Sequence, residues 1–132
     1  TCDWGPDTKT EIMFKECYKL ESTNGHWQRL EDLPIIVSHS EYSTFVHGHK
    51  IFVLGGMTKG YKVTDLIQMY DTRKNQWTLV GRMPWKNKGL IVGHAEGWLY
   101  VAFGQIAISR FNSEFGEVTK SGFRARVNLD NL

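Results

Sequence analysis

An interval of about 50 residues recurs along this sequence and constrains its fold more than any other feature. Aromatic and proline positions in the first third return in the second third with the same order. The matched positions are Tyr18 with Tyr70, Trp27 with Trp77, and Leu33-Pro34 with Met83-Pro84. A period of this length indicates supersecondary units that stack on their neighbours and bury a shared core.

A weaker third copy follows the second one. Residues 48–55 match residues 97–104 at an offset of 49, and a glycine closes both segments. Phe111 then stands seven residues before Val118, the spacing that separates Tyr from Trp in the second copy. The chain therefore contains parts of three units.

Each unit reads as a series of short strands. Apolar runs bounded by glycine or polar turn residues are typical of strands buried between neighbouring sheets. No segment shows a capped helical period. The second unit predicts strands at residues 42–46, 51–54, 66–70 and 77–80. With 13% aromatic residues and 13 glycines, the composition favours the same all-β class.

The second unit resembles a kelch repeat. That family carries a diglycine after the second strand, a Tyr in the third and a Trp at the start of the fourth. The matching residues here are Gly55-Gly56, Tyr70 and Trp77. The resemblance implies a four-stranded blade of a β-propeller, with these residues in structural roles.

The flanking units resemble the repeat less completely. The preceding unit keeps Tyr18 and Trp27, and the following unit keeps Gly104 and has Phe111. Gln105 and Val118 stand where the following unit would have its second Gly and its Trp. We expect the repeat aromatics to be core residues that fill the space between blades. These aromatics are Tyr18, Trp27, Tyr70, Trp77 and Trp98.

The length sets the number of blades. At about 50 residues per blade, 132 residues supply two to three of the ~4–8 blades that close a propeller. We expect a partial first blade at 1–34, a complete kelch blade at 35–84, a degenerate third blade at 85–123 and a tail at 124–132. The favoured interpretation is a partial β-propeller that belongs to a longer chain. The alternative is a ring assembled from copies.

Two cysteines leave two interpretations open. Cys2 and Cys17 lack the spacing of a zinc site or a C-x-x-C motif. On the kelch alignment they fall on adjacent antiparallel strands, and some secreted invertebrate kelch-like proteins look similar at these positions. The resemblance therefore favours a disulfide and an extracellular or secretory location. Two reduced thiols in the cytoplasm are the alternative, and no Asn-x-Ser/Thr acceptor supports secretion.

Charge and motifs exclude several function classes. A net charge of +2 does not favour nucleic acid as a partner, and no apolar run reaches the length of a membrane span. No signal peptide is visible. No residue pattern indicates a catalytic centre, a metal site or a cofactor. The alternative function is an enzyme with a metal or acid/base site in the propeller channel, built from His39, His47 or His94.

The remaining candidates lie in loops, which present variable side chains on a rigid frame. In kelch propellers, the loops that enter first strands and those that join second to third strands crowd one face. By this resemblance we predict a non-catalytic scaffold that binds other protein chains, including copies of itself or the rest of a longer propeller. The predicted contact residues are Ser38, His39, Tyr61, Lys62, Trp85, Lys86 and Lys88.

Overall fold

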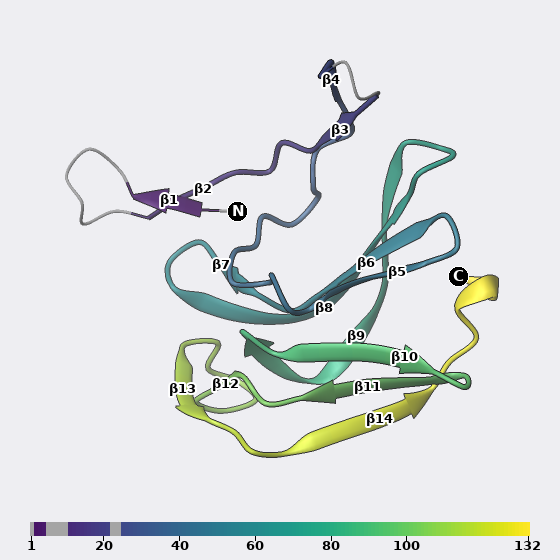
Figure 1. Cartoon of the computed structure of the whole chain (residues 1–132). Coiled ribbons are helices and arrows are strands. Elements are labelled where there is room, and N and C mark those ends of the chain that lie inside the picture. Colours follow the sequence, from purple (N-terminus) through teal and green to yellow (C-terminus); the bar gives the residue numbers. More distant parts are fainter. Residues whose placement is uncertain (1, 5–10, 22–24) are drawn as a thin grey trace.

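The computed structural model describes residues 2–4, 11–21 and 25–132, and its regular structure is almost entirely β (Figure 1). One 3-10 turn, η1 (Leu129–Asn131), follows the last strand. The described residues contain no α-helix, so none of them forms an apolar helix able to cross a membrane. The expected all-β partial propeller is confirmed.

The second unit is a four-stranded antiparallel meander. Consecutive strands lie side by side because short turns join them: Gly48 turns the chain in the left-handed region, and Asp71 opens the turn into the last strand. The strands are β5 (Thr44–His47), β6 (Lys50–Leu54), β8 (Lys62–Asp71) and β9 (Gln76–Lys88). The four predicted strands are present, and β8 and β9 are longer than expected.

The third unit contributes three strands to a separate sheet, called the third sheet, and the meander of the second unit is called the second sheet. They are β10 (Ile91–Ala95), β11 (Trp98–Ala102) and β14 (Gly122–Arg126), in that spatial order. We expected the segment of Phe111 to form the strand beside β11. Instead β14 lies there, and it extends into the predicted tail. Phe111 is 94% exposed and lies outside every strand.

An enlarged loop hairpin accounts for this difference. In the second unit, the short strand β7 (Met57–Thr58) pairs with the start of β8. The corresponding hairpin of the third unit is β12 (Gln105–Ala107) with β13 (Phe115–Val118). Leu54 pairs with Ile67 in the second unit, and Ala102 pairs with Gly122 in the third. Ala102 stands 48 residues after Leu54, whereas Gly122 stands 55 residues after Ile67. The third unit thus has seven extra residues between these strands.

Hydrogen bonds establish the true register of the repeat. The amide of Thr64 donates to the carbonyl of Gly56 (3.1 Å), and 55 residues later Thr119 donates to Gly104 (2.9 Å). In both units the side chain of that Thr also accepts from the amide two residues ahead. Gly104 is therefore the counterpart of Gly56, at an offset of 48.

This register corrects the diglycine assignment. Gly104 was expected to match Gly55, with Gln105 in place of the second glycine. Instead Phe103 occupies the position of Gly55, and both have a φ near +60° (61° and 63°). The third unit therefore holds a phenylalanine in a backbone conformation that costs an L-residue roughly 1–2 kcal/mol.

The N-terminal unit is represented by two separate hairpins. β1 (Cys2–Trp4) pairs with β2 (Glu11–Met13), and β3 (Tyr18–Leu20) pairs with β4 (Trp27–Arg29). Tyr18 and Trp27 were expected in the core, but Trp27 is 66% exposed and Tyr18 is also exposed. The reason is that β3 and β4 form a two-stranded sheet by themselves, without a described strand on either side.

The main core lies between the second and third sheets, which Figure 1 shows as stacked layers. Phe52 and Leu54 from β6 are fully buried there, together with Leu90 ahead of β10. Burial of each such side chain stabilises the fold by about 1.5–3 kcal/mol. Phe45 stacks on Phe52 with ring centroids 4.9 Å apart. The two sheets thus act as one rigid support for the loops.

Candidate interaction surface

The diglycine brings three segments into contact: Gly55-Gly56, the segment of Ser38 and the segment of Asn87. We call the face of the molecule where these segments meet the loop face. A Cβ on Gly55 would lie 2.6 Å from the carbonyl oxygen of Asn87, and one on Gly56 would lie 2.9 Å from the carbonyl oxygen of Ser38. Gly56 also has a φ of +104° and donates its amide to Asn87 (2.8 Å). Only glycine permits this approach, because any Cβ would overlap backbone atoms.

Two of the predicted contact residues lie where β7 turns into β8: Tyr61 in the loop and Lys62 at the start of β8. Tyr61 and Lys62 are both exposed. Tyr61 has a φ of +58°, and Thr58 closes the loop by a hydrogen bond to the carbonyl of Lys62 (3.1 Å). The loop is therefore closed by a hydrogen bond and leaves the Tyr61 side chain exposed.

Ser38 does not belong to the exposed surface. It was predicted as a contact residue, but it is fully buried because its backbone pairs with Met57. Its hydroxyl donates to Glu11 Oε1 (3.1 Å) and also contacts His39 Nδ1 (3.0 Å). The Ser38 hydroxyl and the Glu11 carboxylate oxygen therefore lie on the same side of the His39 ring, next to Nδ1. In a catalytic triad the serine and the acid occupy opposite ring nitrogens, so these residues lack that geometry.

The two predicted lysines Lys86 and Lys88 were expected in a loop, but both lie at the end of β9, and both are partly engaged. Lys86 donates to the Ser113 hydroxyl (2.7 Å), and Lys88 Nζ lies 3.8 Å from the centre of the Phe115 ring. Ser113 also accepts the amide of Val63 through its carbonyl (2.6 Å). These contacts attach the extra hairpin of the third unit to the second unit, so the lysines position that hairpin and are only half exposed.

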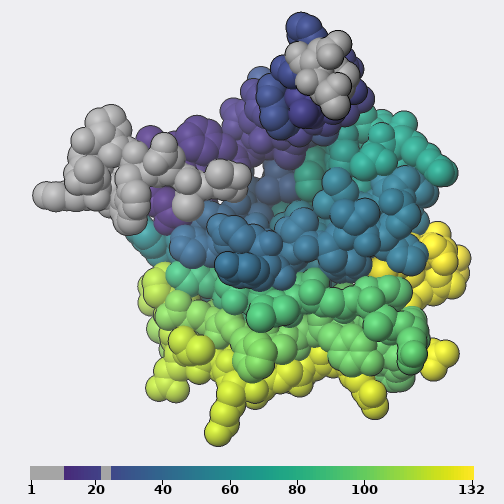
Figure 2. All heavy atoms as spheres, viewed as in Figure 1, coloured from purple at the N-terminus to yellow at the C-terminus, as the bar shows by residue number. Residues whose placement is uncertain are grey.

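Trp85 is half exposed, as predicted for a contact residue. Its ring lies 5.6 Å from that of Phe123 on β14, in a tilted arrangement. The two rings belong to different sheets and border an open groove of about 830 Å³. Figure 2 shows the two sheets of this part of the molecule as adjoining layers.

Sequence reasoning missed the most exposed aromatic of this face, because it placed Phe111 in a strand. The tip of the β12–β13 hairpin is held by its own hydrogen bonds. The Ser109 hydroxyl accepts the amides of Phe111 (3.3 Å) and Asn112 (3.0 Å), and the Asn112 side chain accepts the amide of Glu114 (3.0 Å). The Ser-x-x-Asn-x-Glu pattern is typical of such a turn and was the available signal.

Of the three histidines considered for a channel enzyme, His47 and His94 lie together, whereas His39 lies in a different contact. His47 lies 5.3 Å from His94, ring to ring, and its Nε2 is 2.9 Å from Asp130. His39 instead lies 3.8 Å from Glu11, in the loop before β5. In the part of the chain that the structure describes, no group of three potential ligands is arranged to hold a metal ion.

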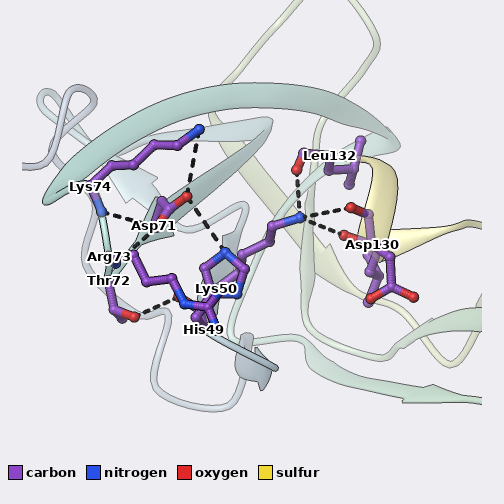
Figure 3. Close-up of polar contacts among 9 residues, drawn as sticks. His49, Lys50, Asp71, Thr72, Arg73, Lys74, Asp130 and Leu132 are labelled. Atoms are coloured by element: carbon purple, nitrogen blue, oxygen red, sulfur yellow. Dashed lines mark hydrogen bonds and ion pairs between the residues drawn. The ribbon is translucent and has the colours of Figure 1, made fainter.

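Asp130 and its neighbours attach η1 to the second sheet (Figure 3). The hydrogen bond from His47 holds the pKa of Asp130 below its ordinary value. The buried Lys50 donates from Nζ to the carbonyls of Leu129 (3.0 Å), Asp130 (3.1 Å) and Leu132 (2.6 Å). Three carbonyl acceptors satisfy the three donors of this buried ammonium. The cluster has a structural role.

Cys17 is a free thiol in the structure, and burial raises its pKa. Cys2 lies opposite Met13 in the β1–β2 pair, whereas the kelch alignment expected it beside the strand of Tyr18. The Cys2 side chain lies outside the described residues. The disulfide therefore stays a prediction.

Comparisons with known proteins agree with this architecture. A family model described as "Kelch motif" matches residues 39–84. A kelch domain-containing protein of Sulfurisphaera tokodaii is 24% identical over 98 residues, which cover 74% of this chain and 13% of the relative. A kelch repeat-containing protein of Arabidopsis thaliana is 25% identical over 125 residues, covering 90% and 29%.

Two further matches extend the comparison. Beta-scruin of Limulus polyphemus is 28% identical over 88 residues, covering 67% of this chain and 9% of the relative. The solved structure of YjhT superposes with a TM-score of 0.61 at 20% identity and covers 70% of this chain and 29% of that chain. The chain thus spans less than a third of the length of these proteins. The motif match, the relatives and the repeated blade geometry together show that residues 39–84 carry a kelch motif and that the chain is similar to kelch-repeat proteins.

Proposed function

We propose that this chain is a non-catalytic scaffold segment that binds other proteins through its loop face. The contrast between a buried frame and exposed loop aromatics supports this function. Gly56 and Asn87 make a buried backbone contact, whereas Tyr61 on the β7–β8 loop, Trp85 near the end of β9 and Phe111 on the β12–β13 hairpin are exposed. Rigid presentation of aromatic side chains lowers the entropic cost of binding.

A crosslinking experiment tests this function directly. A photoreactive phenylalanine analogue replaces Tyr61 or Phe111, and the matched control places it at Arg73, in the turn between β8 and β9. We expect protein adducts from the loop positions in an extract of the source cells, and we expect unlabelled protein to compete with them. Equal adduct yields from all three positions would contradict the proposal.

The cellular location and the state of the cysteines are part of the same proposal. We place the protein in an extracellular or secretory compartment with a bridge between Cys2 and Cys17. The basis is the resemblance of the cysteine positions to secreted kelch-like proteins. Intact mass before and after reduction tests it: a gain of two protons supports the bridge, and an unchanged mass contradicts it.

A further inference from the structure

The seam groove is the space between the second and third sheets on the loop face. It has a volume of about 830 Å³, within the usual size range of ligand pockets. Apolar side chains from both sheets and from the enlarged hairpin form most of its surface. The larger ones are Met83, Trp85, Ile106, Ile108 and Phe123. Trp85, Ile108 and Phe123 remain exposed and lack a described covering element.

The corresponding contact at the start of the second unit, between Gln68 and Ile35, explains why the seam groove stays open. Gln68 is fully buried, and its side-chain amide accepts from the amide of Ile35 (2.9 Å) and donates to the carbonyl of Ile35 (3.0 Å). By the repeat register, Phe123 takes the place of Gln68 and Trp85 takes the place of Ile35. An aromatic pair cannot make the two polar bonds that close this corresponding contact. It leaves ring surface for another side chain instead.

The charge of the groove indicates what kind of segment fits it. Its single carboxylate, Asp65, is paired with Arg82 at 2.6 Å. Lys86 and Arg110 also line the groove, so three cations face one neutralised acid. Arg110 is exposed and forms no hydrogen bond or ion pair among the described residues. An excess of positive charge around an apolar surface attracts acidic partners and raises their association rate.

We infer that the seam groove binds an extended acidic segment of a partner protein. One large apolar side chain of that segment packs against Trp85, Ile108 and Phe123. Its flanking carboxylates pair with Arg110 and with the Lys86 side of the groove. This inference rests on the proposed function and names its site and partner chemistry.

An NMR titration of the full chain tests the inference. The probe is the capped peptide Ser-Glu-Asp-Glu-Phe-Glu-Asp-Glu-Ser, added to ¹⁵N-labelled protein. We expect saturable shifts at the Trp85 indole N–H and at the amides of Ile108 and Phe123. A peptide with Ser in place of Phe and the variant Arg110→Glu should each weaken binding by about tenfold, a typical effect for an anchor residue.

Matched variants separate this site from the rest of the loop face. Tyr42→Ala removes an exposed aromatic, and Lys59→Glu reverses an exposed charge, both outside the groove. Each should change Kd less than twofold. Shifts centred on Tyr61, or no saturable shifts, would overturn the seam-groove inference. The crosslinking experiment would then test the scaffold function by itself.

Discussion

Gln68 on β8 holds the segment that leads into the second unit through a single buried amide, and its replacement gives a sharp test of this contact. In Gln68→Leu the side-chain volume is largely kept, but both hydrogen bonds to Ile35 are lost. Each lost bond removes about 0.5–1.5 kcal/mol, and the half-buried Ile35 groups lose their partners as well. We expect a loss of about 2–3 kcal/mol in the free energy of unfolding, which lowers Tm by roughly 6–12 °C.

Gln68→Glu adds a pH dependence to this test. An ionised carboxylate would face the Ile35 carbonyl in a fully buried position, and burial raises the pKa of an introduced acid. Protonation restores a donor toward that carbonyl. The folded pKa is raised, so the variant loses stability as the pH rises from about 4.3 to the folded pKa and recovers as it falls. Gln68→Leu should show no such recovery.

Urea unfolding followed by tryptophan fluorescence measures both variants at pH 5 and pH 8. The control is Gln76→Leu, which alters an exposed glutamine at the start of β9 and should change stability by less than about 0.5 kcal/mol. If Gln68→Leu behaves like this control, or if Gln68→Glu is equally unstable at both pH values, the amide does not hold this segment and the reasoning is wrong.

Three further perturbations follow from the described contacts. Gly56→Ala should lower the free energy of unfolding by more than about 2 kcal/mol in thermal unfolding, because the added Cβ meets Ser38 and Val37. The control Gly60→Ala has open space around the added Cβ and should lower it by only about 1 kcal/mol. Lys50→Met should raise amide hydrogen exchange in η1, since three carbonyls lose their donor, whereas Lys74→Met at an exposed site should leave it unchanged. The Asp71 carboxyl should titrate below 3.8 by NMR: burial alone would raise its pKa, but the amides of Arg73 and Lys74 lower it more. Its stabilising effect is therefore present above pH 3.8 and disappears as the pH falls through the folded pKa, so Asp71→Asn should match the native protein in acid.

The strands of the second unit and the role of the diglycine were readable from local patterns. Short apolar runs between glycine and polar turns define strands wherever the flanking sheets bury both faces, and Gly55-Gly56 marks a close backbone approach. The exposure of Tyr61 and Trp85 followed from the same repeat, although Trp85 lies in β9 and not in the expected loop.

The third unit shows where that reasoning ends. An insertion shifts every later residue, so a match at one offset placed Phe111 in a strand, although the backbone bonds place it in a loop. The positive φ of Phe103 could not be predicted from its residue type. It accompanies the backbone hydrogen bonds that join Phe103 to Ser121 and Gly104 to Thr119. Burial of Ser38 likewise depends on its pairing with Met57, a residue distant along the chain.

Local sequence periodicity thus determines the blade type, because strands and turns depend on residues that are neighbours along the chain. Contacts between blades depend on which side chains meet across a seam. Gln68 holds Ile35 with hydrogen bonds, whereas Phe123 leaves the seam groove open and apolar. Only the tertiary structure brings Trp85, Phe123 and Arg110 around one groove, because they come from β9, from β14 and from the enlarged β12–β13 hairpin, which are separate segments of the chain.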